Sequence, residues 1–236
     1  DEDGTIHYFL YDSAKGKYVD ESGIDLTLVI NSASSAERYV LMDKGGNSLS
    51  FSSLGKLGKI QDLEGNQMIL VYGGNGALST VTDGSGRTLT LNTDGAGRLL
   101  SMSDPAGRST SYTYNGTQLE RITYPDGKSS TYTYDGNRKL LTATNHDGDR
   151  IGWSYYGVAP YRVKKIAETS TSGTLGGELS LSYGYNTTVF TDYLGRSQAY
   201  QFNNQGNTLS VKDNEGYASN YGYGTEVSSK NKLTLE

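Results

Sequence analysis

Few side chains in this sequence belong to the types that commonly perform catalysis or bind metals. The 236 residues include 2 histidines, His7 and His146, and no cysteine. A zinc site usually needs three or four clustered nitrogen, oxygen or sulfur ligands, and a Ser-His-Asp triad needs a histidine between a serine and an acid. His146 stands beside Asp147 and Asp149 in a turn-like stretch. The sequence leaves both kinds of site open, but it favours a turn role for these residues.

Three acidic residues, Glu120, Glu168 and Glu178, are candidates for glycoside hydrolysis. That reaction needs two carboxyl groups roughly 5–10 Å apart in a cleft. None of the three has a special sequence context, so we expect all of them to be solvated surface groups.

Two kinds of glycine-rich stretch resemble ligand-binding loops. "GGNGALSTV" (residues 73–81) begins like a calcium-binding nonapeptide, but Leu78 stands where that motif needs aspartate. "GSGR" and "GAGR" join predicted strands to each other, so no helix N-terminus follows to bind a phosphate. We therefore predict no cofactor, no metal and no catalytic residue.

The composition narrows the class of protein. Only 34% of the residues are hydrophobic even with the 20 tyrosines counted, so the rings must supply much of the buried surface. The net charge of −5 has both signs interspersed, which argues against nucleic-acid binding. No apolar run approaches the roughly 18 residues of a membrane span. The chain begins at Asp1, and we interpret it as a segment of a longer protein.

A repeat of 20 or 21 residues runs along most of the chain. It is marked by glycines that close aspartate-containing turns: Gly45, Gly65, Gly86, Gly107, Gly127, Gly148, then Gly195 and Gly216. Three of these glycines are followed by arginine, as Gly86-Arg87, Gly107-Arg108 and Gly195-Arg196. Internal periodicity of this kind indicates a repeat architecture.

A second turn divides each repeat into two short runs that alternate like strands. Examples of the second turn are Asp94 to Gly97, Asn115-Gly116 and Asp135-Gly136, where glycine or asparagine supplies positive φ. The runs between turns are rich in threonine, leucine and tyrosine with period two. The sequence therefore predicts an all-β chain of consecutive antiparallel β-hairpins of about 21 residues, forming one long curved sheet.

The Tyr-x-Tyr pairs place two rings on one face of a strand, since alternate strand residues share a face. Tyr112 with Tyr114 and Tyr132 with Tyr134 are the clearest pairs. We expect these rings to stack on rings of neighbouring strands, leaving a small, polar opposite face.

Two stretches depart from the pattern. Ser34 to Val40 could form one or two turns of helix, and the extra residues of a degenerate repeat near 160–182 are expected in a polar loop over Ala167–Gly177.

With these features in place, the chain resembles the YD-repeat, or Rhs (rearrangement hotspot), family. The resemblance rests on Gly97-Arg98-Leu99, on Tyr114-Asn115 to Leu119, and on Tyr134-Asp135 to Leu140, at the family's spacing. It extends over residues 3–223, and the stretches 192–196 and 200–206 resemble the wall-associated, Gram-positive branch. The resemblance implies a hollow β-shell around a C-terminal cargo, of which this chain would be an arc.

The resemblance also raises one chemical possibility. Asp104-Pro105-Ala106-Gly107 resembles the autoproteolytic signature of the family, but Arg108 follows where an apolar residue is usual. Its phase is that of an ordinary aspartate turn, so a structural role is favoured.

We expect residues 1–38 to be a lead-in segment of the shell and residues 39–236 to be the repeat sheet. The chain is a non-enzymatic segment of a secreted, cell-surface or cell-wall bacterial shell that encapsulates or scaffolds a cargo or toxin domain. Its partners are the rest of the parent shell, the cargo, and copies of itself through weak edge-strand association, with no nucleic acid and no membrane insertion. The alternative is a carbohydrate- or cell-surface-binding module that uses exposed rings; an enzyme is the remaining hypothesis.

Overall fold

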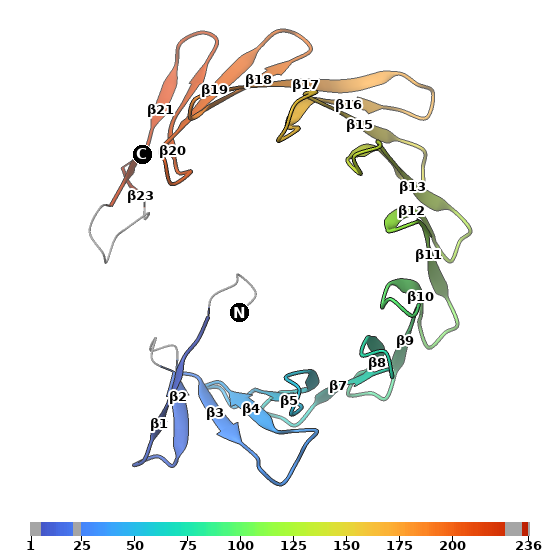
Figure 1. Cartoon of the computed structure of the whole chain (residues 1–236), viewed down its shortest axis with the longest axis vertical. Helices are drawn as coiled ribbons and strands as arrows, with labels where there is room; N and C mark the ends of the chain where they lie inside the picture. The colour runs from blue at the N-terminus through green and yellow to red at the C-terminus, as the bar shows by residue number, and fades with distance from the viewer. Residues whose placement is uncertain (1–5, 21–24, 225–232, 236) are drawn as a thin grey trace. The chain divides into compact units, whose positions relative to one another are not determined.

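The computed structural model describes residues 6–20, 25–224 and 233–235. Two compact units, Asp1–Tyr112 and Thr113–Glu236, divide the chain within strand β11. The described residues contain strands and turns and no helix (Figure 1). The prediction of an all-β chain of antiparallel hairpins is therefore confirmed. The expected division at residues 38/39 stays a prediction.

In the first unit, each strand pairs antiparallel with the next one along the chain. The strands are β1 (Phe9–Asp12), β2 (Lys17–Asp20), β3 (Thr27–Ile30), β4 (Tyr39–Met42), β5 (Ser48–Phe51), β6 (Leu57–Gln61), β7 (Gln67–Tyr72), β8 (Leu78–Thr82), β9 (Thr88–Thr93), β10 (Leu99–Ser103) and β11 (Ser109–Asn115).

The second unit continues the same pattern from β12 to β21. Its strands are β12 (Gln118–Thr123), β13 (Ser129–Tyr134), β14 (Leu140–Thr144), β15 (Arg150–Tyr155), β16 (Val163–Thr169), β17 (Leu175–Gly184), β18 (Thr187–Asp192), β19 (Ser197–Phe202), β20 (Thr208–Asp213) and β21 (Ala218–Asn220). A separate pair consists of β22 (Gly222–Tyr223) and β23 (Leu233–Leu235).

The sheet is a single layer within each unit. No hydrophobic residue of the described chain is buried, and the two buried polar residues are Ser50 at 2% and Ser130 at 5% exposure. Many apolar side chains of the strands are half-buried, and others, such as Met68 and Val71, are exposed. Stability must therefore come from backbone ladders, cross-strand pairs and turns, because no second layer covers the sheet.

The expected unbroken stack of rings is not found at the centre of the repeat. Tyr132 lies opposite Ala143, and Ala143 lies opposite Ile151 in the next strand. The reason is the repeat length, because each repeat contributes one tyrosine-rich strand and one strand of smaller residues. Equivalent rings are thus two strands apart, about 9–10 Å, which is too far for direct stacking.

Ring contacts occur instead where the pattern changes. Tyr11 meets Tyr18 at 5.2 Å between centroids, and Phe190 meets Tyr200 at 5.2 Å, both edge-on.

Two further expectations were wrong. Ser34 to Val40 is not helical, since residues 32–37 form turns and Tyr39 and Val40 belong to β4. Seven residues are too few to nucleate a helix alone, while Val40 gains ladder partners on both sides of β4.

The loop expected over Ala167–Gly177 is also absent, because only residues 170–174 form the turn and the rest extends β16 and β17. Additional residues lie in the wider turn between Tyr156 and Arg162.

The turns impose the repeat's glycines through backbone geometry. In the turn that begins at Asp94, the Gly97 N–H donates to the Asp94 carbonyl, and Gly97 has a φ of 80°. This is a three-residue hairpin loop whose last residue is left-handed. The turn of Asp135 differs from the prediction that Gly136 supplies the positive φ. Arg138 has the positive φ there, at 64°.

Gly97 and Gly95 allow a matched test of this constraint. A Cβ added at either position meets open space, but only Gly97 has positive φ. Gly97→Ala should lower the free energy of unfolding by about 1–2 kcal/mol, because left-handed backbone strains any residue with a Cβ. Gly95→Ala should leave it nearly unchanged in urea denaturation. Equal effects of the two substitutions would contradict the φ argument.

Candidate functional site: the repeated turns and the tyrosine clamp

The aspartate turns share one set of side-chain contacts. In the turn of Asp83, one carboxylate oxygen accepts hydrogen bonds from the Ser85 and Arg87 backbone N–H groups at 2.9 and 3.0 Å. The other oxygen accepts from the Arg87 Nε at 2.8 Å. The carboxylate thus satisfies loop donors and fixes the arginine that follows the glycine.

The same arrangement recurs in both units. The arginine Nε lies 2.7 Å from the aspartate Oδ2 in Asp94–Arg98, Asp104–Arg108 and Asp192–Arg196. The predicted signature glycines Gly86, Gly107 and Gly195 occupy the left-handed position, with φ of 78°, 79° and 80°. Nothing in the contacts of Asp104 sets its turn apart from the others, despite the Asp-Pro sequence.

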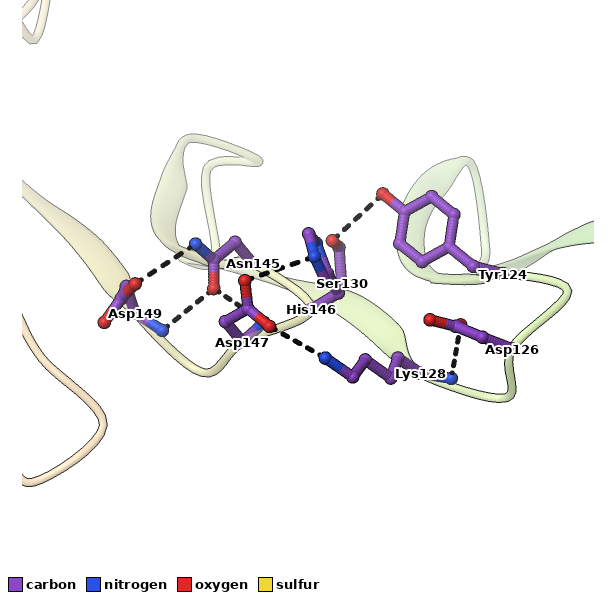
Figure 2. Close-up of polar contacts among 8 residues, drawn as sticks. All are labelled: Tyr124, Asp126, Lys128, Ser130, Asn145, His146, Asp147 and Asp149. Atoms are coloured by element: carbon purple, nitrogen blue, oxygen red, sulfur yellow. Dashed lines mark hydrogen bonds and ion pairs between the residues drawn. The ribbon is translucent and has the colours of Figure 1, made fainter.

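Two turns that are one repeat apart, at residues 124–128 and 145–149, replace this contact with one that joins the two turns (Figure 2). Tyr124 and Asn145 occupy the aspartate position of these turns. The Lys128 ammonium lies 2.8 Å from the carboxylate of Asp147 in the turn that begins at Asn145. His146 lies 3.2 Å from Asp147 and packs edge-on against Tyr124, whose hydroxyl is 3.1 Å from the Ser130 hydroxyl. His146 is thus part of a contact between turns.

A second recurring arrangement lies at the second turn of the repeat, and we call it the tyrosine clamp. The Tyr155 hydroxyl donates to the Leu140 carbonyl at 2.7 Å. The Lys139 ammonium, next to Leu140, lies 5.4 Å from the centre of the Tyr155 ring and 4.3 Å from that of Tyr161. One ring therefore holds both the backbone and the cation of the preceding hairpin.

Two other sites repeat the clamp. Tyr72 donates to the Leu57 carbonyl at 2.9 Å beneath Lys56, whose ammonium is 4.7 Å from the ring centre. Tyr183 donates to the Val163 carbonyl at 2.9 Å, with the Arg162 guanidinium 5.0 Å from its ring. A cation–π contact of this kind contributes about 0.5–1 kcal/mol at an exposed site.

The chain varies the clamp from repeat to repeat. Arg98, Leu99 and Tyr114 hold the in-phase positions of the next complete set. Where Ala77 replaces the cation, Thr93 replaces the tyrosine, and Asn75 instead bonds the Thr93 hydroxyl at 3.0 Å. In this repeat, neither the cation nor the ring is present.

Some of the tyrosines at clamp positions are predictable from the sequence, and the cations are not evident from the Tyr-x-Tyr pattern. Tyr112 and Tyr114 lie in β11, and Tyr132 and Tyr134 lie in β13, so the four are spread along the sheet and do not converge on one site. Lys56, Lys139 and Arg162 were missed. The available signal was a cation before leucine or valine, with a tyrosine 15 residues after the leucine in the regular repeats.

The structure also separates the residues considered for chemistry. His7 contacts Asp20 at 3.0 Å in the first unit, whereas His146 lies in the second. Glu120 lies in β12, away from the other two glutamates. Glu168 and Glu178 lie on the paired strands β16 and β17, opposite Gly177 and Ala167; Glu168 is exposed and Glu178 pairs with Lys165. In the described part of the chain, no three histidine or acidic residues are grouped to hold a metal, and no helix is long and apolar enough to cross a membrane.

Comparison with known proteins now bears on the repeat itself. Residues 94–120, which contain the Asp94 and Asp104 turns, match the family model described as RHS Repeat. This stretch is therefore similar to an RHS repeat. Among curated proteins, no sequence relative matches.

Two solved structures share the fold. One is the Tc holotoxin pore of Photorhabdus luminescens, with a TM-score of 0.60 and 14% identity over 97% of this chain. The other is the TcdB2-TccC3 crystal structure without its hypervariable C-terminal region, with a TM-score of 0.59, 14% identity and the same 97% coverage. This chain spans only 15% of the length of either.

The resemblance to RHS-repeat proteins inferred from the sequence is therefore confirmed. The assignment to the wall-associated, Gram-positive branch stays a prediction.

The clamp hydrogen bond can be tested by removing one oxygen atom. Tyr155→Phe should lower the free energy of unfolding by about 1 kcal/mol, because it leaves the Leu140 carbonyl without this donor. Tyr185→Phe is the matched control, since Tyr185 is 88% exposed and its hydroxyl has no hydrogen bond within the described chain. Urea denaturation of both variants gives the comparison, and equal stabilities would rule out a contribution from the clamp.

The turn carboxylates predict a loss of stability in acid. Side-chain hydrogen bonds from Arg87, Arg108 and Lys139 hold the pKa values of Asp83, Asp104 and Asp135 below the ordinary 3.8. The folded chain thus binds fewer protons than the unfolded chain near pH 3.8. The stabilisation is present above that pH and is lost as pH falls through the lowered pKa values.

Denaturation midpoints measured from neutral pH downward should therefore be level until about pH 4–5 and then drop. The triple variant Asp83→Asn, Asp104→Asn, Asp135→Asn should show a shallower drop. A drop of unchanged size in that variant would assign the acid sensitivity to other groups.

Proposed function

We propose that this chain is a non-enzymatic segment of the wall of a larger RHS-repeat shell. The observation that carries the proposal is the single-layer sheet, in which no hydrophobic residue of the described chain is buried. Such a sheet makes a wall and lacks the two packed layers of an ordinary domain. The RHS repeat and the fold shared with two Tc toxin structures support it.

The finer proposal concerns what the wall encloses and where it works. By analogy with the Tc toxin complexes, the parent shell would encapsulate or scaffold a C-terminal cargo or toxin domain. Its partners would be the rest of the shell and that cargo. The location would be secreted or at the bacterial cell surface or cell wall, with residues 1–38 as the lead-in segment.

The contacts within the sheet suit a wall. Turn carboxylates and tyrosine clamps recur along the sheet, and a different contact takes their place in the repeats that lack them. A wall needs such a contact at each junction, because any weak junction between strands would open it.

The alternative carbohydrate-binding function gains less support. Rings of Tyr72, Tyr155 and Tyr183 lie beneath cations and donate their hydroxyls to backbone carbonyls. Rings engaged in this way are not displayed as a platform for sugars.

The wall proposal predicts association through the sheet edges. Within the described residues, β1 pairs only with β2, and Leu10 in β1 is exposed together with Ile6 and Tyr8 just before the strand. An unpaired edge with apolar side chains is a template for another strand. We expect the sedimentation coefficient of the chain to rise with concentration.

The double variant Tyr8→Lys, Leu10→Lys should remove this association, since edge lysines block strand pairing. Leu54→Lys with Leu194→Lys is the control, because it adds the same charge at two exposed turn tips. A strictly monomeric wild-type chain at high concentration would mean that its edges are capped. That result would identify a self-contained domain and contradict the wall proposal.

A further inference from the structure

A concavity of the second unit lies over strands β13 to β17, a region drawn in green to gold in Figure 1. It measures about 510 Å³, within the range of ligand sites. We call it the β13–β17 groove. Its lining includes Tyr132, Ala143, Asp149, Ile151, Glu168 and Gly176.

The groove follows one cross-strand row of the sheet. Tyr132 lies opposite Ala143, Ala143 opposite Ile151, Ile151 opposite Glu168, and Glu168 opposite Gly177. Small residues at Ala143 and Gly177 leave space beside the larger side chains of the same row. The sizes of the side chains along this row therefore produce the hollow.

Two adjacent glycines keep the end of the row open. A Cβ at Gly177 would lie 3.8 Å from the Glu168 Oε2, and a Cβ at Gly176 would lie 3.6 Å from the Glu168 Cβ. Neither glycine has positive φ, so no turn geometry requires them. Their shared effect is to leave the Glu168 side chain uncovered.

The charge of the groove is negative. Within the described chain, Glu168 has no ion pair, and Asp149 accepts only a 3.4 Å hydrogen bond from Asn145 at its carboxylate. Arg150 also contributes to the lining, but it alternates with Ile151 along β15, which directs its side chain to the opposite face.

The floor between the carboxylates is aliphatic. Ala143 lies opposite Ile151, which is 37% exposed. A long basic side chain matches this order of surfaces, since its methylene stem packs on apolar groups while its charged end stays with the carboxylates.

We propose that the β13–β17 groove binds an extended polypeptide segment through an arginine or lysine side chain. The stem lies over Ala143 and Ile151, and the cation lies between Glu168 and Asp149. The inference goes beyond the wall function and holds whether or not the parent shell carries a cargo. A neutral sugar would use the hydroxyl and amide groups of the lining and leave both carboxylates without a cation, so the test below distinguishes the two ligands.

The test is a titration of the whole chain with an acetylated, amidated Gly-Val-Arg-Val-Gly peptide, followed by NMR chemical shifts and calorimetry. Binding should shift the amide signals of Ile151, Glu168 and Gly177, and it should weaken with added salt. The same peptide with glutamine in place of arginine should bind at least tenfold more weakly.

Three variants separate the groove from general charge. Glu168→Gln should weaken binding about tenfold, which corresponds to about 1.4 kcal/mol, and Gly176→Leu should abolish it by filling the hollow. Glu120→Gln removes the same charge from exposed β12 and should leave binding unchanged.

Circular dichroism and urea denaturation verify that each variant is folded. If Gly176→Leu does not fold, Ile151→Thr on the same floor takes its place, with a weakening of several-fold expected.

Several results would overturn the proposal. They are an absence of binding at millimolar peptide, equal binding by wild type and Glu168→Gln, and shifts that map outside β13–β17. Stronger binding of a neutral oligosaccharide at the same residues would overturn it in favour of a sugar site. None of these results depends on the edge association that tests the wall function.

Discussion

The hydrogen-bonded ladder between consecutive hairpins is the interaction on which the rest of the structure depends. Ordinary domains can lose a few ladder bonds because a hydrophobic core holds their layers together. Here no hydrophobic residue of the described chain is buried, so each hairpin is held mainly by its two neighbours. Stability is then close to a sum of nearest-neighbour terms, as in other repeat proteins. Every feature that fixes the position of one hairpin against the next therefore has a disproportionate effect.

Turns and clamps fix that position in complementary ways. The aspartate turn acts within one hairpin, since its carboxylate binds two backbone N–H groups and the arginine of the same loop. The tyrosine clamp acts at the open end of a strand pair, since Tyr155 at the end of β15 holds the backbone at the start of β14 and the Lys139 cation of the preceding turn. A ring suits this task because it offers an apolar body, a face for a cation and a hydroxyl donor at once. This combination gives a role to Tyr72, Tyr155 and Tyr183 among the 20 tyrosines of the chain.

The sequence was sufficient to predict the parts that obey local rules. The glycine spacing located the turns, and period-two alternation identified the strands, because φ requirements and side-chain direction are set by neighbouring residues. It failed where a choice depended on partners in space. Val40 joined a ladder instead of a helix, and Ala167 extended a strand because β15 and β17 were available on either side. The clamps were missed for the same reason, since the cation and the ring meet only after two hairpins have paired.

Departures from the repeat carry more functional information than the repeat itself. Identical hairpins would present identical surfaces, so a specific contact can arise only where residues differ from the consensus. The strongest departures lie close together in the second unit: the Lys128–Asp147 bridge between turns, the extended strands β16 and β17, and the Gly176-Gly177 pair. Asn145 belongs to both the bridging turns and the lining of the β13–β17 groove. The loss of the standard aspartate–arginine turn and the opening of the groove thus occur in one region, which is where selection for a partner would act on a wall built from repeats.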